Sequence, residues 1–402
     1  MKVVAFDIRA NHATGVARYG ESVLAAAAPI AAKNAIRLLI ITRPGQETAA
    51  RPALAYGHQV ITIPGDDGFV RGSAKLRGLL ARSDVDLFHT SHYTVDRSCP
   101  VPFSFTVHDL TRWRFPELGY SDESFTARFG ASEFVRLEQE IGQMSAFDPG
   151  GDSVFTRYFK AVNQYMASQA RRIVTVSATS ARDITRLLGF PDSAIDLVPC
   201  GVDTKVFRPR SSAEVDTVMA RFKLGDGPYL MFVGLVHKHK RFEWLADHLT
   251  QAHARMPQGS RIAVVGGHAE QASVASPSPG AAEAGDLFAF LGRVSDEELA
   301  ALYTGASAWI TASVNEGNNL PPLEALACGT EVIATDIPPL RETIGTYGHF
   351  YPPEDPQAML ALAEAALHAR LPQRAPTFSA PTWHDAGRLL VDSWQRSLGE
   401  TS

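Results

Sequence analysis

The segment from residue 308 to residue 329, AWITASVNEGNNLPPLEALACG, contains the repeating unit from which the fold can be built. Its first five residues form an apolar run that is typical of a buried strand, and a polar turn with Gly317 follows. From Leu320 to Gly329 the pattern is helical. The two early prolines are tolerated because the first N–H groups of a helix lack partners within it. Strand, turn and helix in this order are the unit of α/β proteins.

The same alternation extends in both directions along the chain. The first half contains β-branched and aromatic runs that predict strands at Val3–Ile8, Arg37–Thr42, Val60–Ile63, Asp86–His89, Phe103–Val107, Ile173–Ser177 and Ile195–Val198. The second half predicts strands at Tyr229–Val233, Arg261–Val265, Leu287–Leu291, Ala308–Ala312, Val332–Thr335 and His349–Tyr351. Several runs are apolar on both faces, which is expected where helices cover both sides of a parallel sheet. The fold class is therefore α/β, with two doubly wound, Rossmann-like sheets.

A polar stretch separates the two halves and predicts a hinge. We expect one domain at residues 1–205, a second at residues 206–380, and an amphipathic helix at residues 381–402 that packs on a neighbouring element. Open α/β sheets bind ligands beyond the carboxyl ends of their strands, so two facing sheets predict a central cleft that holds the ligand.

Two segments depart from this compact plan. Residues 115–155 are too long for an ordinary connection, in which about 2–6 residues are usual, so they predict either a mobile lid or a recognition element. Residues 268–285 are rich in Ala, Ser, Pro and Gly and predict a solvated loop.

Composition excludes several classes of function. The 402 residues are 45% apolar and 20% charged with a net charge of −5, so nucleic acid is not expected as a partner. Cys99, Cys200 and Cys328 have neither metal-ligand nor disulfide-framework spacing, which indicates reduced thiols and a cytoplasmic location. The sequence predicts no signal peptide and no membrane span, while attachment at the inner face of a membrane stays open.

The turn before Leu320 predicts an anion site. The N–H groups of Asn319, Leu320 and Leu323 would be free at the start of the helix, where the helix dipole favours a phosphate or diphosphate. Glu316 and Glu324 flank this site. Carboxylates beside a diphosphate are repelled unless they accept hydrogen bonds from hydroxyl groups, which a sugar supplies. The alternative is that both carboxylates are solvated surface charges.

Positive charge for such a ligand could come from the turn after Val233. Gly234 permits a close approach of backbone to ligand, and the run from His237 to Arg241 includes Lys240 as a candidate for stabilising a leaving group. The alternative is a solvated basic turn that leads into the next helix. A dinucleotide site is disfavoured, because the turn at Gly266 lacks a third glycine at the spacing that such sites need.

The first half offers two further candidates. Gly15 opens a helix that could present N–H groups to a ligand, although an ordinary helix start fits equally well. His108 closes a strand and could bind a substrate hydroxyl, or it could be a structural histidine beside Asp109. Histidines are scattered and no metal-ligand cluster is seen, so no metal or other cofactor is expected.

In order and spacing these motifs resemble the retaining glycosyltransferases of family 4, which have the GT-B fold. The resemblance covers nearly the whole chain. Its segments are the turn at Gly15, Val107–Leu110, Val176–Ser177, Val198–Asp203 with Phe207–Pro209, Phe232–Gly234 with Lys240, Phe290–Leu299, Glu316–Glu324 and the final helix from Trp383.

The resemblance implies roles for particular residues in a donor site. Glu324 would bind the donor ribose and Glu316 the donor sugar, while Asn318, Asn319 and Leu320 would hold sugar and phosphate. Lys240 would neutralise the diphosphate with Gly234 and His239 beside it, and Gly15 would approach from the N-terminal, acceptor-side domain. Arg293 and Val294 would border the nucleobase, and His108 would lie near the reacting carbon. The final helix would cross back to the N-terminal domain.

Two departures from the family pattern affect this site. The family usually has Phe-Gly at the positions of Asn318 and Asn319, and asparagine is among the residues that best tolerate a positive φ. An arginine commonly precedes the family lysine, where this chain has His239, which is only partly charged near neutral pH.

The resemblance implies an enzyme, a metal-independent hexosyltransferase acting with retention. A nucleotide diphosphate sugar would be the donor, with GDP-mannose or GDP-fucose ahead of UDP-sugars. The acceptor would be a glycan or lipid-linked glycan hydroxyl in surface polysaccharide or glycoconjugate biosynthesis. Two alternatives stay open: a nucleotide-sugar 2-epimerase-like isomerase, and an inactive subunit that only binds the donor.

Overall fold

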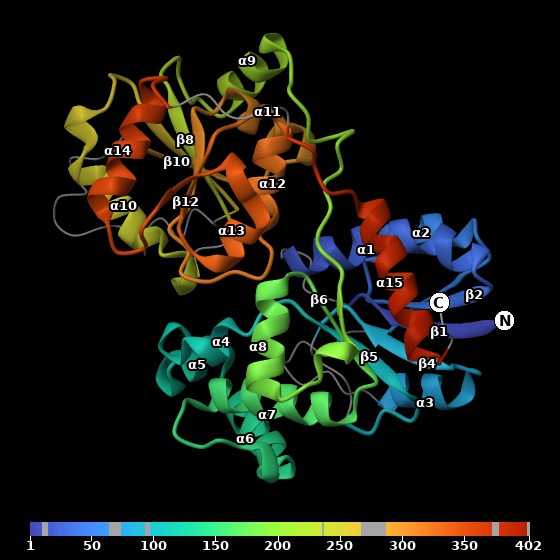
Figure 1. Cartoon of the computed structure of the whole chain (residues 1–402). Coiled ribbons are helices and arrows are strands. Elements are labelled where there is room, and N and C mark those ends of the chain that lie inside the picture. The colour runs from blue at the N-terminus through green and yellow to red at the C-terminus, as the bar shows by residue number, and fades with distance from the viewer. Residues whose placement is uncertain are drawn as a thin grey trace. The chain divides into compact units, whose positions relative to one another are not determined.

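The computed structural model describes residues 1–9, 15–63, 74–92, 97–234, 237–266, 287–371 and 378–399. The chain forms two compact units (Figure 1). Unit 1 comprises residues 1–201 and 382–402, and unit 2 comprises residues 202–381. The sequence placed these divisions at 205/206 and 380/381.

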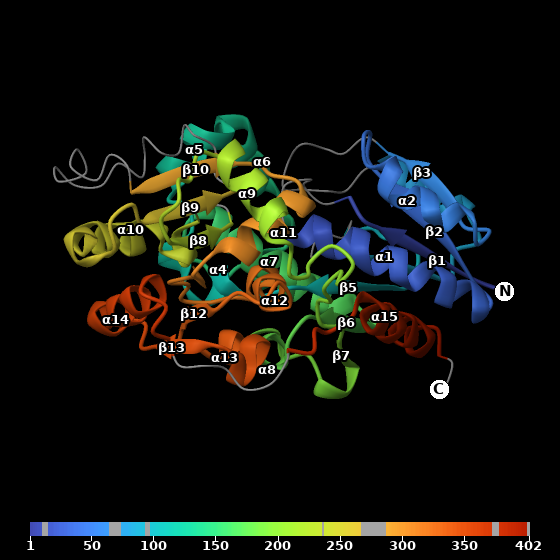
Figure 2. The ribbon, with the colours of Figure 1, turned by 90° about the horizontal axis from the view of Figure 1, so that it is seen from above.

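Unit 1 is built on a parallel seven-stranded sheet. Its strands, in spatial order, are β3 (Gln59–Thr62), β2 (Ile36–Thr42), β1 (Lys2–Asp7), β4 (Leu87–Thr90), β5 (Phe103–Val107), β6 (Arg172–Thr175) and β7 (Ile195–Leu197). Figure 2 shows β3, β2 and β1 side by side. All seven predicted strands of the first half are confirmed, and the strand order reverses between β1 and β4.

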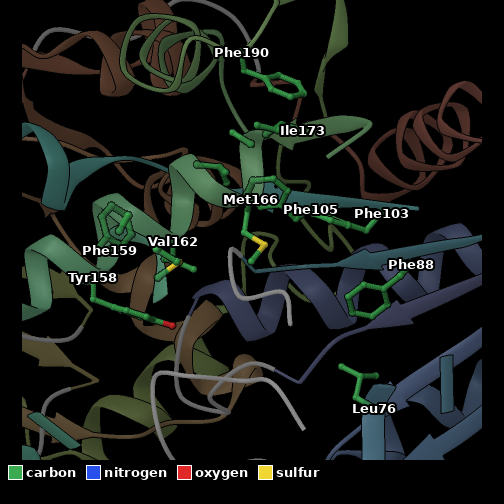
Figure 3. Close-up of a cluster of buried hydrophobic side chains, with 14 of the residues drawn as sticks. Leu76, Phe88, Phe103, Phe105, Tyr158, Phe159, Val162, Met166, Ile173 and Phe190 are labelled. Atoms are coloured by element: carbon green, nitrogen blue, oxygen red, sulfur yellow. The ribbon is translucent and has the colours of Figure 1, made fainter. Parts of the chain in front are cut away.

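Helices cover both faces of this sheet. On one face, α1 (Gly15–Lys33) packs against α15 (Trp383–Ser397). On the other face, α3 (Ala74–Arg82) and α7 (Val154–Gln169) bury an aromatic core with the strands. Figure 3 shows Phe105 of β5 together with Val162 and Met166 of α7 in this cluster. The remaining helices of the unit include α2 (Glu47–Leu54) and α8 (Ala178–Leu188).

Residues 115–155, predicted as either a mobile lid or a recognition element, are a helical part of unit 1. They follow α4 (Thr111–Arg114) and form α5 (Asp122–Phe129) and α6 (Ala131–Gln143) before α7 begins. The side chain of Phe125 is fully buried and stacks on Phe155 with 5.5 Å between the ring centroids. Aromatic packing of this kind orders the segment, because it buries apolar surface that an extended loop would expose.

Unit 2 has a parallel six-stranded sheet. Its spatial order is β10 (Phe288–Gly292), β9 (Arg261–Val265), β8 (Tyr229–Val233), β11 (Ala308–Ile310), β12 (Val332–Thr335) and β13 (His349–Tyr351). All six predicted strands are confirmed, and the order reverses between β8 and β11. The predicted loop at 268–285 lies outside the described residues.

Helices also cover both faces of the second sheet (Figure 1). One face packs on α10 (Phe242–Gln251) and α14 (Pro356–Leu367). The other packs on α11 (Asp296–Gly305), α12 (Leu320–Ala327) and α13 (Pro338–Ile344), and α9 (Ser212–Arg221) lies on α11.

The chain passes between the units twice, and the two passages run side by side. The N–H of Val202 donates to the carbonyl of Pro381 over 2.8 Å. Gly201 lies against Trp383, so closely that a Cβ at position 201 would come within 2.2 Å of the Trp383 backbone nitrogen. A glycine is therefore required at this position.

Candidate active site

Two loops that carry candidate residues of unit 2 lie where its strand order reverses. The turn from Gly234 to Arg241 follows β8, and the loop from Thr311 to Asn319 follows β11. These strands are neighbours in the sheet and parallel, so both loops leave from their carboxyl ends at one edge. This is the point at which open α/β sheets bind ligands.

Lys240 and Glu316 meet across these two loops. The ammonium nitrogen Nζ of Lys240 is 2.8 Å from Oε1 of Glu316, and the two side chains are 15% and 9% exposed. The N–H of Val314 donates to the carbonyl of His239 over 2.9 Å, which joins the loops through their backbones as well. The two candidate catalytic groups of unit 2 are thus a nearly buried ion pair.

Two buried hydroxyl groups orient the Glu316 carboxylate. Ser313 donates to Oε1 of Glu316 over 2.7 Å, and the hydroxyl of Thr311 lies 2.9 Å from that of Ser313. A serine hydroxyl has one hydrogen, so Thr311 must be the donor to Ser313. Both hydrogen bonds that Glu316 accepts from described residues go to Oε1. Oε2 is therefore the oxygen left to accept from a ligand.

The backbone that carries these hydroxyls is held from the neighbouring strands. Thr335 at the end of β12 donates to the carbonyl of Ser313 over 2.5 Å. Tyr351 at the end of β13 donates to the carbonyl of Thr311 over 2.7 Å. Sequence reasoning missed Thr311 and Ser313 as site residues. The available signal was two hydroxyl residues directly after a buried strand and just before an acidic residue.

Gly234 shapes the turn that carries Lys240. Its φ is +142°, and a Cβ at this position would lie 3.4 Å from Cδ and Cε of Lys240. Glycine thus permits the left-handed turn and leaves room for the lysine stem to lie across it. His239, beside Lys240, stacks its ring on His237 with 5.6 Å between centroids.

The start of α12 brings together the other predicted ligand groups. Asn319 precedes the helix with φ +61° and ψ +93°, and Leu320 is its first residue. Glu324, one turn further on, is buried and accepts a hydrogen bond from Tyr303 over 3.3 Å. A helix start with its dipole is suited to hold an anion, and Lys240 contacts Glu316 in the loop that precedes this helix.

Asn318 is tied to the neighbouring helix. Its amide nitrogen donates to the hydroxyl of Thr343 in α13 over 3.2 Å, and that hydroxyl donates back to the Asn318 carbonyl over 2.6 Å. These two hydrogen bonds fix the loop in front of α12, so Asn318 has a structural role in the protein without ligand.

Arg293 and Val294 follow β10 at the same edge of the sheet, two strands away from β8. Arg293 is exposed, Val294 is partly buried, and the next residue, Ser295, caps α11. Neither is joined to Lys240 or Glu316 by a hydrogen bond or ion pair among the described residues.

Gly15 and His108 belong to unit 1. Gly15 is the first residue of α1. His108 follows β5, and its Nε2 is 2.9 Å from the carbonyl of Ser91, so Nε2 carries the hydrogen and Nδ1 keeps a lone pair. Its ring meets Tyr19 edge-on at 5.0 Å. Burial lowers the pKa of His108 below its usual value, so the ring is neutral near pH 7 and can accept from a hydroxyl.

No group of three or more His, Cys, Asp and Glu side chains in the described part of the chain is arranged to hold a metal ion. Among the described helices, none combines the length and the apolar character needed to cross a bilayer.

Two family models match the chain. Residues 31–206 match the model described as Glycosyltransferase Family 4. Residues 227–369 match the model described as Glycosyl transferases group 1. The first segment lies almost wholly in unit 1 and the second lies in unit 2, where it includes Lys240, Glu316 and Glu324.

Curated relatives include two mannosyltransferases. O-antigen chain mannosyltransferase B of Escherichia coli is 29% identical over 209 residues, which are 51% of this chain and 54% of that protein. MMP alpha-(1->4)-mannosyltransferase of Mycolicibacterium hassiacum is 30% identical over 193 residues, 47% of this chain and 43% of that protein. The chain spans about half the length of the curated relatives it matches.

Solved structures match over the full length. A glycosyltransferase from Rickettsia africae superposes with a TM-score of 0.64 at 15% identity, covering 100% of this chain and 99% of that one. Anabaena HepE in complex with UDP and glucose superposes with a TM-score of 0.62 at 14% identity, covering 98% and 95%. At these identities the likeness shows a shared fold.

Proposed function

Because the chain belongs to the family 4 glycosyltransferases and has their GT-B fold, we propose that it transfers a hexose-type sugar from a nucleotide diphosphate sugar to an acceptor hydroxyl, with retention at the anomeric carbon. The observation that carries this proposal is the ion pair of Lys240 and Glu316 at the reversal point of the second sheet. The pair supplies one cation and one carboxylate that can accept from a hydroxyl group, and Glu316 stands in the loop before α12.

The proposed assignment divides the donor between these groups. The diphosphate takes Lys240 and the free N–H groups at the start of α12 as its partners. Oε2 of Glu316 accepts from a hydroxyl of the transferred sugar, and Glu324 accepts from the ribose. A carboxylate can only accept hydrogen bonds, and a sugar hydroxyl can donate one. These pairings therefore bring no second negative charge next to Glu316 or Glu324.

The proposed transfer occurs on one face of the sugar. The bond from the anomeric carbon to the diphosphate oxygen breaks, and its electron pair leaves with the diphosphate. The acceptor oxygen bonds to the same face of that carbon, and the acceptor proton passes to the leaving phosphate oxygen. In this step Lys240 neutralises the charge that builds on the diphosphate, so no metal is assigned a role.

GDP-mannose is the proposed donor, followed by GDP-fucose and then UDP-sugars. The names of the two relatives described above, both mannosyltransferases, support a mannosyl donor. The name of the Escherichia coli relative also supports a glycan acceptor in surface polysaccharide assembly. For a lipid-linked acceptor we propose that a cytoplasmic enzyme works at the inner face of the membrane.

The proposal is tested in two steps. Thermal unfolding of the purified protein is measured with GDP-mannose, GDP-fucose and UDP-glucose, and the donor with the largest shift is then assayed for transfer to a mannose-containing glycan. Glu316→Gln and Lys240→Ala are each expected to lower the transfer rate at least ~100-fold. The exposed Lys205 of unit 2 supplies the matched control, Lys205→Ala, which should retain full activity.

Three results would count against the proposal. Near-normal turnover in either site variant contradicts the assigned roles. An epimerised nucleotide sugar formed without acceptor indicates the isomerase alternative. Donor binding with no transfer to any glycan indicates an inactive donor-binding subunit.

A further inference from the structure

Asn319 combines a strained backbone with an unused side chain. Its φ of +61° is in the left-handed region, and its side chain makes no capping hydrogen bond to α12 although it stands directly before that helix. Its amide nitrogen is buried, and none of the described residues accepts a hydrogen bond from it. Asparagine before a helix ordinarily accepts from the helix N–H groups, so this residue is not serving as a cap.

The neighbouring residue, Asn318, has a structural role and provides a comparison. The amide of Asn318 is paired with Thr343, whereas that of Asn319 has no such partner. The backbone angles of position 319 suit glycine better than asparagine. Folding alone would favour glycine there, because glycine avoids both the strain and the unpaired N–H group.

The chemistry of the unpaired group complements that of Glu316. Oε2 of Glu316 can only accept a hydrogen bond, and the amide N–H of Asn319 can only donate one. A sugar hydroxyl does both. A phosphate oxygen would satisfy Asn319 but could not donate to Oε2 of Glu316, three residues earlier in the same loop. Asn319 is partly exposed as a residue, and its amide nitrogen, buried in the protein without ligand, would turn about the Cβ–Cγ bond to reach a bound molecule.

We propose that the side-chain amide of Asn319 is a specificity-determining donor that binds a hydroxyl of the transferred sugar. The proposal rests on the proposed function, because it needs a nucleotide sugar in this site. It assigns Asn319 to the sugar and leaves the diphosphate to Lys240 and the helix start.

Asn319→Gly tests this directly, because it removes the amide and keeps the backbone angles. Calorimetry measures binding of the best nucleotide sugar, GDP-mannose or UDP-glucose, and of its free diphosphate, GDP or UDP. We expect affinity for the nucleotide sugar to fall about tenfold and that for the free diphosphate to stay within about twofold. The thermal midpoint should not fall, because relief of the left-handed strain offsets the greater flexibility of the unfolded chain.

Two more variants complete the test. Asn319→Asp keeps the shape, replaces the donor with an acceptor, and should weaken sugar binding at least as much. Thr343→Val removes the hydroxyl that pairs with Asn318 and should lower the thermal midpoint. It should change the affinities for the nucleotide sugar and for the free diphosphate by the same factor. An equal loss for both ligands in Asn319→Gly, or no loss for either, overturns the proposal. A wild-type protein that binds no nucleotide sugar overturns the proposed function instead.

Discussion

Breaking the ion pair of Lys240 and Glu316 should lower the free energy of unfolding by an amount that can be calculated from the structure. Replacing Lys240 by methionine keeps much of the stem but leaves the carboxylate, 9% exposed, with Ser313 and without its cation. Two charges 2.8 Å apart attract by about 6 kcal/mol at an effective dielectric constant of 20. Desolvation offsets part of this, so Lys240→Met should lower the free energy of unfolding by about 3 kcal/mol.

A double-mutant cycle separates the pair from its surroundings. Glu316→Gln retains an acceptor for Ser313 and should cost about 2 kcal/mol. The double variant leaves no buried charge unpaired, so we expect it to lose only about 3 kcal/mol, which corresponds to a coupling of about 2 kcal/mol. Urea unfolding followed by circular dichroism, without ligand, measures all four proteins.

An exposed pair provides the control for this cycle. Arg388 and Asp392 lie one turn apart on α15 at 3.3 Å, with side chains 53% and 33% exposed. Solvent screens such pairs, so the same cycle on them should give a coupling below about 0.5 kcal/mol. Losses in the Lys240 and Glu316 variants that add within ~0.5 kcal/mol would refute the reasoning, because independent sites behave that way.

Three further predictions concern buried groups. Ser313→Ala removes the hydroxyl that donates to Glu316 and should lower kcat/KM for transfer roughly tenfold, whereas Thr335→Val, which removes a hydrogen bond to the Ser313 carbonyl and none to Glu316, should lower it less; equal effects in steady-state assays would contradict this. Burial lowers the pKa of His89 to about 3, so the folded state resists the proton that the unfolded state binds below pH 6.5, and the protein should lose about 2 kcal/mol of stability between pH 7 and pH 5. Urea unfolding at both pH values measures this loss. A His89→Gln variant that loses the same free energy of unfolding between pH 7 and pH 5 would rule out His89 as its cause. Burial and the nearby Glu324 charge raise the pKa of the Cys328 thiol to about 12, so a thiol reagent at pH 8 should label it only after unfolding, as peptide mass spectrometry can show.

The sequence allowed the strands and the position of the site to be predicted, for a common physical reason. Apolar runs such as Tyr229–Val233 are buried on both faces, so local pattern and tertiary position agree. Lys240 and Glu316 are 76 residues apart, yet each follows a strand next to the reversal of the sheet order. Both residues were selected as charged groups in turns that follow predicted strands, and the family resemblance gave their roles.

Other features depend on side-chain orientation and long-range packing, which a pattern does not contain. The chain of hydrogen bonds from Thr311 through Ser313 to Glu316 depends on the rotamers of these side chains. The folding of residues 115–155 into helices depends on aromatic packing such as that of Phe125 on Phe155, which the length of the segment did not reveal. The contrast between Asn318 and Asn319 depends on where Thr343 of α13 lies.

The return of the chain to unit 1 through α15 has a consequence for biosynthesis. The indole of Trp394 is fully buried and meets the ring of Phe6 at 5.3 Å, so the last helix covers the first strand. A ribosome makes all of unit 2 before it makes α15. The face of α1 that α15 covers therefore stays exposed in the nascent chain until α15 has been synthesised. The first unit to begin folding is the last to be completed.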